Sequence, residues 1–331
     1  MHPDQKIDPR AVTGRLQAVD LARGLALVAM AIYHFTWDLE FFGYVPPGMT
    51  GVGGWKIFAR CIAASFLFLV GVSLVLAHGR GIRWHGFWRR LAMVGGAALA
   101  ISAATYLAMP ETFIFFGILH QIALASVLGL AFLRLPPVIT ILVAAGIVAA
   151  PFLLRSEVFD HPALWWVGLS ATIPRSNDYV PLFPWFGPVL IGVAVGRLGL
   201  ITGVFARLAE LRFGSPFRPL FFIGRHSLAF YLVHQPVLIG SLWLFSQLLP
   251  AQALTDDDRL RYSCQATCQQ TQDESFCTRY CNCMRDELDA SGDLPKLFQG
   301  REDPALRDRI SGLAGLCTSR AEEGVLEDTA P

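Results

Sequence analysis

Long apolar stretches alternate with short polar ones over the first 250 residues, and each stretch has about the length that crosses a bilayer. The segments predicted to span the membrane are residues 16–37, 55–77, 87–109, 113–133, 138–154, 181–200 and 220–248. Helices satisfy their own backbone hydrogen bonds, which a lipid environment requires. The pattern therefore predicts an all-α polytopic membrane protein with about seven transmembrane helices.

The character of the chain changes after Pro250, where a polar, cysteine-rich tail begins. The tail cysteines are Cys264, Cys268, Cys277, Cys281, Cys283 and Cys317. Cysteines four residues apart share a helix face, so two short antiparallel helices could join Cys264 to Cys281 and Cys268 to Cys277. A zinc site is the alternative, but structural zinc usually shows CX2C pairs, so the spacing favours disulfides. The predicted parts are residues 1–15, 16–250 and 251–331.

Positive charge is distributed unevenly between the segments that connect the spans. With the N-terminus inside, the cytoplasmic segments hold 13 Lys and Arg residues, whereas the opposite side holds 4. Cytoplasmic loops are enriched in these residues, so we expect an N-in, C-out topology with the tail outside the cytoplasm. Only 16% of residues are charged and the formal net charge is +1, so nothing points to a nucleic-acid partner.

The first predicted span carries ionisable side chains, which are costly at membrane depth and indicate a functional site. They are Asp20, Arg23, His34 and Asp38. Arg23 and His34 are eleven residues apart, which places them on nearly the same helix face and about 16 Å apart along the axis. Such a pair could hold the two ends of an extended substrate. The alternative is that Arg23 reaches the lipid head groups and His34 is a packing residue.

Three further groups of polar residues are candidates. The last span begins with Arg225 and Ser227 and carries Tyr231, His234 and Gln235, which share a helix face; a polar contact between helices is the alternative. His120 is either an interhelical contact or a catalyst, and Asp178 and Trp185 either line a substrate mouth or anchor at the interface. Arg89 and Arg90 lie in a basic cytoplasmic loop that suits lipid head groups or the phosphates of a cofactor.

Five segments in order carry a resemblance to a known family. They are RLQAVDLARGLALVAMAIYHFTWDLEFFG, FLFLVGVSLVLA, FFGILHQIAL, DYVPLFPWFGPVLIGVAVG and FIGRHSLAFYLVHQPVL. Together they resemble the bacterial proteins grouped with the heparan-α-glucosaminide N-acetyltransferase catalytic domain, over residues 15–248. The spacing of Arg23 and His34 also resembles the R/K-X10-H signature of membrane acyltransferases that O-acetylate sugars. The resemblance implies transfer of an acyl group from cytoplasmic acetyl-CoA to a sugar or glycan acceptor.

The resemblance also implies roles for the candidate residues. Arg23, Arg89 and Arg90 would bind the phosphates of CoA, because a guanidinium fork suits phosphate oxygens. Eukaryotic members are thought to use a histidine in the first luminal loop, and residues 43–56 contain none. The role of general base or acyl carrier therefore moves to His34, with Asp38 holding its tautomer and His120 or His234 stabilising charge. The residues expected to bind the acceptor are Asp178, Trp185, Arg225, Ser227 and Gln235.

No metal-site motif, P-loop or dinucleotide fingerprint occurs, so we expect no metal ion. The expected location is the inner membrane of a bacterium, with the tail in the periplasm, lipids as partners and a possible homo-oligomer. Two other functions fit the pattern less well. A proton-coupled transporter would also use intramembrane histidines, but the spans show no paired halves. A membrane anchor for a Cys-rich binding module would need one span and no buried charges.

Overall fold

The computed structural model describes residues 16–79, 81–251, 254–269, 271–298 and 303–328. Within these ranges the regular structure is helical, and one isolated β-bridge joins Ser156 to Ser170. The predicted N-terminal segment, residues 1–15, lies outside the described residues, as does Arg80. The all-α fold predicted from the sequence is therefore confirmed.

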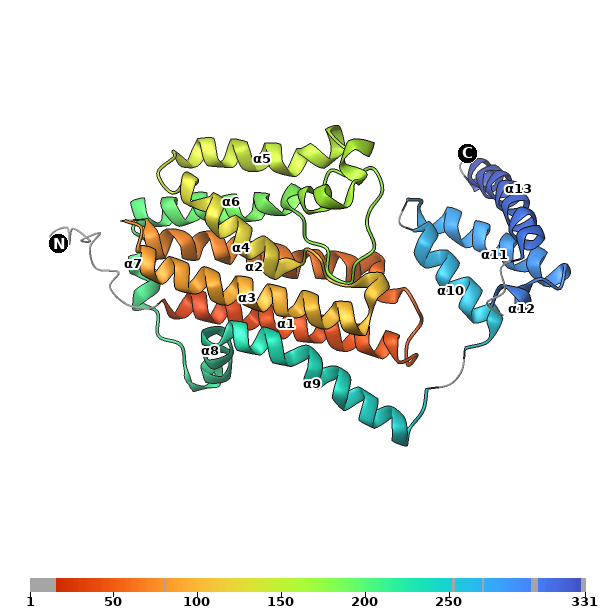
Figure 1. Ribbon diagram of the computed structural model, residues 1–331, viewed down its shortest axis with the longest axis horizontal. Helices are drawn as coiled ribbons and strands as arrows, with labels where there is room; N and C mark the ends of the chain where they lie inside the picture. The colour runs from red at the N-terminus through yellow and green to blue at the C-terminus, as the bar shows by residue number, and fades with distance from the viewer. Residues whose placement is uncertain (1–15, 80, 252–253, 270, 299–302, 329–331) are drawn as a thin grey trace. The chain divides into compact units, whose positions relative to one another are not determined.

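The helices follow the predicted apolar segments closely (Figure 1). The α-helices up to residue 250 are α1 Gln17–Phe41, α2 Gly53–His78, α3 Trp84–Ala108, α4 Ile118–Gly129, α5 Pro137–Leu153, α6 Leu182–Ile201, α7 Val204–Glu210, α8 Arg218–Arg225 and α9 Ser227–Leu248. The short 3-10 helices are Met49–Gly51, Pro110–Thr112, Leu130–Phe132, Glu157–Asp160, Pro162–Val167 and Ser215–Phe217. In the described part of the chain, α1, α2, α3, α6 and α9 are long and apolar enough to cross a membrane, whereas α4 with its 3-10 extension and α5 are shorter.

The fourth and the seventh predicted spans differ most from the helices of the structure. The fourth begins at Ile118 instead of residue 113, because the Asp178 carboxylate accepts a hydrogen bond from the Ile118 N–H and so defines the helix start. The seventh is divided into α8 and α9, because His226 has φ −106° and ψ 34°, which are not helical values. Apolar periodicity carries no signal for either break.

The chain forms two compact units by its internal contacts. Unit 1 contains residues up to Met30 and Arg60–Val233, and unit 2 contains Ala31–Ala59 and His234–Pro331. The sequences of α1 and α9 are each divided between the two units. Each unit is described by itself below.

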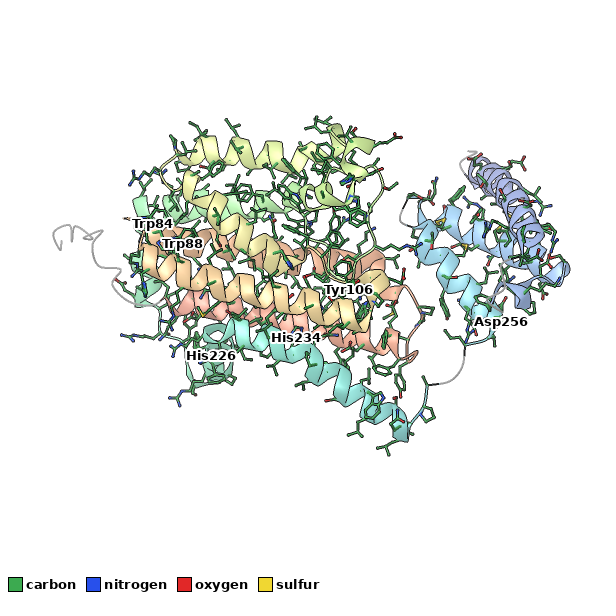
Figure 2. The ribbon with its side chains drawn as sticks, viewed as in Figure 1. Trp84, Trp88, Tyr106, His226, His234 and Asp256 are labelled. Atoms are coloured by element: carbon green, nitrogen blue, oxygen red, sulfur yellow. A yellow bond between two sulfur atoms is a disulfide. The ribbon has the colours of Figure 1, made fainter. Side chains whose placement is uncertain are left out.

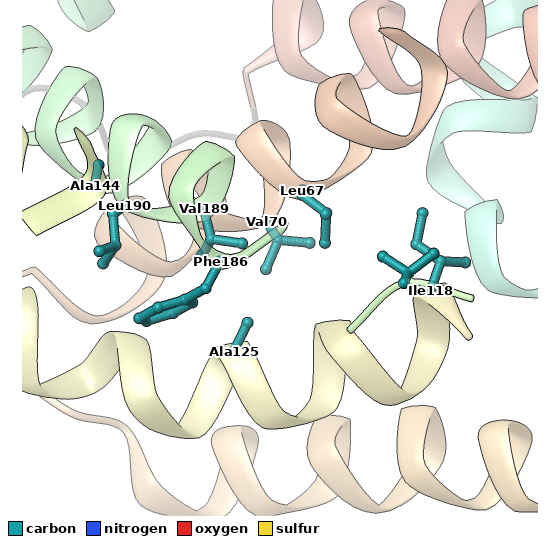
Figure 3. Packing of buried hydrophobic residues seen from close by; sticks show 9 residues of the cluster. Leu67, Val70, Ile118, Ala125, Ala144, Phe186, Val189 and Leu190 are labelled. Carbon is teal, nitrogen blue, oxygen red and sulfur yellow. The ribbon is translucent and has the colours of Figure 1, made fainter. Parts of the chain in front are cut away.

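The core of unit 1 lies between α2, α4, α5 and α6 (Figure 3). Its buried members are Leu67, Val70, Ile118, Ala125, Ala144, Val180, Phe186, Val189 and Leu190. Helices α2 and α6 approach each other closely at Gly71 and Gly192, where an added Cβ atom would collide with the backbone of the facing helix. Small residues at such crossings are typical of helices that pack within membranes.

Aromatic residues lie near both ends of α3. Figure 2 shows Trp84 and Trp88 in its first turns and Tyr106 close to its last residue. All three side chains are exposed, and Trp and Tyr are enriched where a helix meets the two membrane interfaces. Their positions support α3 as a full membrane span.

The tail in unit 2 is a small helical domain with three disulfides. Its helices are α10 Asp256–Cys268, α11 Glu274–Ala290, α12 Leu294–Leu297 and α13 Pro304–Asp328. Thr255 and Asp273 cap α10 and α11 through their side-chain oxygens. The disulfides are Cys264–Cys281, Cys268–Cys277 and Cys283–Cys317. The first two are the pairs that the spacing predicts, and the third ties α11 to α13.

Candidate active site

Two histidines form the centre of the polar site in unit 2. His34 of α1 and His234 of α9 approach with 2.6 Å between His34 Nδ1 and His234 Nε2, and their rings lie 4.9 Å apart and nearly parallel. A neutral imidazole has one N–H and one lone pair, so one ring donates and the other accepts. If His34 donates from Nδ1, its Nε2 carries a lone pair that can take a proton. His234 is buried and lies part-way along α9 (Figure 2).

A second pair lies on the same two helices within unit 2. Gln235 Nε2 donates a 2.6 Å hydrogen bond to Asp38 Oδ1. The other oxygens of the pair, Asp38 Oδ2 and Gln235 Oε1, are buried and make no hydrogen bond. Both are acceptors, and a buried acceptor without a donor is costly. The pair therefore offers two open positions for N–H or O–H groups of a ligand.

The sequence led us to expect that Asp38 holds His34 in one tautomer. In the structure the hydrogen-bond partner of His34 is His234, and that of Asp38 is Gln235. His34 and Asp38 still share one face of α1, because they are four residues apart. Helix periodicity placed His34 and Asp38 on one face of α1, but it did not show which side chains form hydrogen bonds with them.

Three residues that sequence reasoning missed fix the loop after α1. The Glu40 carboxylate accepts hydrogen bonds from Gly48 N at 2.5 Å, Thr50 N at 2.9 Å and Thr50 Oγ1 at 2.7 Å. Tyr33 donates from its hydroxyl to the Thr50 carbonyl, and its ring centre lies 5.8 Å from that of His34. The loop therefore holds Tyr33 in place beside His34. The sequence signals this loop only by the glycine at position 48, whose φ is +81° in the structure.

A separate charged cluster lies in unit 1. Arg23 donates to Asp20 Oδ1 at 3.2 Å and to Ser73 Oγ at 2.6 Å, and Arg225 Nε lies 3.6 Å from Asp20 Oδ2. Asp20 is almost fully buried, so two guanidinium groups face one enclosed carboxylate and the cluster has a net positive charge. Arg225, expected at the acceptor, lies with Arg23. Such a cluster can attract an anion such as a phosphate.

Arg90 lines a narrow, shallow crevice in unit 1. His78 and Ser126 also line the crevice, together with apolar side chains. His78 Nδ1 accepts a hydrogen bond from the Arg83 backbone N–H, so its Nε2 carries the hydrogen and can donate. Arg89, next to Arg90 in α3, is exposed. The crevice offers cationic and N–H groups for an anionic ligand.

His120 is engaged by its surroundings in unit 1. Its Nδ1 accepts from the Gly117 N–H at 3.2 Å, which leaves the hydrogen on Nε2, 3.1 Å from Ser102 Oγ. The Ser102 hydroxyl in turn donates to the Ile114 carbonyl. This serine is therefore not activated by the histidine, and both ring nitrogens stabilise the corner between α3 and α4.

The other residues predicted to bind the sugar substrate have structural roles in unit 1. Asp178 caps α4 through Ile118 N at 2.8 Å, and burial raises the pKa of its carboxyl group to about 6. Trp185 packs against the core cluster, and Ser227 begins α9. No group of three or more potential metal ligands occurs among the described residues.

Comparison with known proteins identifies the family of the chain. The family model described as heparan-alpha-glucosaminide N-acetyltransferase, catalytic, matches residues 15–236. No curated protein and no solved structure matches the chain. The matched region covers about two thirds of the sequence and contains His34, Asp38, His234 and Gln235. The chain therefore belongs to the heparan-α-glucosaminide N-acetyltransferase catalytic-domain family, a family of transmembrane acetyltransferases.

Proposed function

We propose that this protein transfers an acetyl group from cytoplasmic acetyl-CoA to a hydroxyl or amino group of a sugar or glycan on the other side of the membrane. The observation that carries the proposal is the contact between His34 and His234, two histidines inside predicted membrane spans of a member of an acetyltransferase family. Paired histidines at membrane depth need a reason beyond packing, because polar side chains there are costly.

His34 is the general base in this proposal. Its Nε2 removes the proton from the acceptor hydroxyl or amine as that group attacks the acyl carbon. For this role His34 Nδ1 donates to His234 Nε2 across the 2.6 Å contact. That hydrogen bond fixes the tautomer and stabilises the imidazolium, as a carboxylate does for the histidine of a catalytic triad. His34 then returns the proton to the departing sulfur. General-base catalysis of this kind contributes about 10²- to 10⁴-fold to a rate.

Two oxygen atoms on the same helices as the histidines are suited to bind the sugar that receives the acetyl group. Asp38 Oδ2 and Gln235 Oε1 can each accept from an O–H or N–H group, and both atoms are buried without a partner. A sugar has several such donors on one ring. We therefore assign Asp38 and Gln235 to acceptor binding instead of tautomer control.

Arginines in unit 1 suit the donor. Acetyl-CoA supplies the acyl group as a thioester and carries several phosphates. The net positive cluster of Asp20, Arg23 and Arg225 and the crevice lined by Arg90 have the chemistry that binds phosphate oxygens. Arg23 itself is held by Asp20 and Ser73, so Arg225 and Arg90 are the better candidates for direct phosphate contacts.

The proposed location is a bacterial inner membrane, with the N-terminus in the cytoplasm and the tail in the periplasm. The uneven distribution of Lys and Arg supports this orientation. The three disulfides of the tail support it independently, because disulfides persist in oxidising compartments.

Purified protein in lipid vesicles tests the proposal. Vesicles supplied with acetyl-CoA and a panel of amino sugars and neutral sugars should release free CoA thiol only when an acceptor is present. A transporter has no use for acetyl-CoA, so solute uptake without thiol release would replace the proposal by transport. If removal of residues 256–331 abolished every measurable function, the membrane region would be an anchor instead.

A further inference from the structure

Gln121 of α4 is a buried amide without hydrogen bonds. Its side chain has no exposed surface, and neither Oε1 nor Nε2 has a hydrogen-bond partner. In the described part of unit 1, no other residue has a buried side-chain nitrogen or oxygen atom without a hydrogen-bond partner. Thr140, which is equally buried, donates its hydroxyl to the Pro136 carbonyl and shows how such a group is normally satisfied.

The face of α4 that carries Gln121 is otherwise apolar. Gln121 shares this face with Ile118 and Ala125, three residues before and four after, and both belong to the core cluster of unit 1. An unpaired buried polar group costs about 1–3 kcal/mol, whereas an apolar side chain of the same shape would cost nothing. The fold alone therefore gives no reason for a glutamine at this position.

We propose that Gln121 binds the amide-bearing arm of the acyl donor, an assignment that rests on the proposed use of acetyl-CoA. The pantetheine arm of CoA is a thin chain of methylene and methyl groups interrupted by two amides. A glutamine offers one acceptor and one N–H donor group, which match a C=O and an N–H of that arm. The aliphatic neighbours of Gln121 match the methylenes.

A sugar fits this position less well. Its hydroxyl groups point in many directions, and each would need a partner that Ile118, Ala125 and the rest of the apolar cluster do not provide. Gln121 also belongs to unit 1, as do the arginines suited to the phosphates of CoA. Because the side chain is fully enclosed, the donor reaches it only when side chains packed against α4 move aside.

Binding measurements on the purified full-length protein test this inference without knowledge of the acceptor. The ligands are CoA and adenosine 3′,5′-bisphosphate, which has phosphates and the adenosine but lacks the arm. The variants are Gln121→Leu and, as a closer match in shape, Gln121→Met. Thr140→Val is the matched control, because it removes a buried polar group that already has its hydrogen bond.

We expect Gln121→Leu to weaken CoA binding about tenfold, since about two hydrogen bonds are lost, and to leave adenosine 3′,5′-bisphosphate binding unchanged. The same variant should raise the melting temperature of the protein without ligand, because an unsatisfied group is removed. Thr140→Val should lower the melting temperature and leave the ratio of the two affinities unchanged.

Three results would overturn the inference. If Gln121→Leu and Gln121→Met bind CoA as tightly as the natural protein, the arm does not contact Gln121, although the proposed function stands. If both variants fail to fold, Gln121 has a structural role that the inference denies. If the natural protein does not bind CoA, the donor in the proposed function is wrong, and the inference fails with it.

Discussion

Two buried aspartates show how differently the tail and the membrane helices use polar groups. Asp293 in the tail is bound by Lys296 at 2.6 Å and by Arg309 at 2.9 Å, so both of its oxygens are paired with cations. Asp38 in α1 has one neutral partner, Gln235, and one oxygen without any. Asp293 is thus fully paired and stabilises the tail, whereas Asp38 keeps one acceptor oxygen open for a ligand.

The same contrast holds for the way each region is held together. The tail has a small core around Met284 and Leu288 and closes it with three disulfides. The membrane helices of unit 1 have a larger apolar core and close glycine contacts. Changes in the tail should therefore alter stability, and changes at the open polar groups should alter activity.

The largest expected effects are at the histidine pair, His34 and His234. His234→Leu removes the acceptor for His34 Nδ1–H and should lower the rate of acetyl transfer about a thousandfold, within the range of general-base catalysis. His234→Gln keeps an acceptor oxygen and should retain a rate much closer to the natural one. Thiol release from acetyl-CoA measures both. Equal rates for the two variants would mean that the hydrogen bond has no role in catalysis.

The second-largest expected effect is the loss of stability when a tail disulfide is removed. Replacing Cys283 and Cys317 by serine opens a cross-link that spans 34 residues, which should cost about 3–4 kcal/mol of tail stability. Loss of Cys268–Cys277, which spans 9 residues, should cost about 2–3 kcal/mol. Limited proteolysis of the full chain in membranes measures this as faster cleavage of the tail alone. Cleavage at the natural rate in both variants would show that the disulfides do not stabilise the tail.

Asp38→Asn should have a smaller effect, and only on acceptor binding. Asparagine can still pair with Gln235, but it lacks the negative oxygen that faces the ligand. We expect the KM for the acceptor to rise about tenfold, with the KM for acetyl-CoA unchanged and the protein as stable as before. A change confined to acetyl-CoA would move Asp38 from the acceptor to the donor.

The smallest effect is the acid sensitivity of the tail. Hydrogen bonds from Lys296 and Arg309 lower the pKa of Asp293 from 3.8 to about 2. A lowered pKa gives stability that is fully present above the pKa of the unfolded chain and is lost as the pH falls toward the folded value. Tail stability should therefore decrease between about pH 4 and pH 2 by an amount that Asp293→Asn removes. An unchanged acid transition in that variant, measured by proteolysis, would exclude this ion pair as the cause.

Much of the fold could be predicted because apolar length and cysteine spacing are local properties of a sequence. The seven apolar segments each contain a helix, and two disulfides follow the spacing of Cys264, Cys268, Cys277 and Cys281. The third disulfide could not be predicted, because Cys283 and Cys317 are joined only by the packing of α11 on α13. The break at His226 depends on one residue and leaves no periodic signal.

The sequence singled out His34, Asp38, His234 and Gln235 without their contacts. It also singled out His120 and Asp178, whose side chains stabilise the start of α4. Helix periodicity places His34 with Asp38 and His234 next to Gln235, but the register between α1 and α9 decides which side chains meet. Glu40 was missed because its role depends on the folded loop, and Gln121 because only the structure shows that it has no partner.

The most direct test of the account is the rate of thiol release from acetyl-CoA by His34→Ala in lipid vesicles, measured beside the natural protein at equal amounts of folded protein. We predict a loss of at least about a thousandfold, with CoA binding unchanged, because the variant lacks the base but keeps the donor site. A rate within a fewfold of the natural protein would contradict the assignment of His34 as the catalytic base.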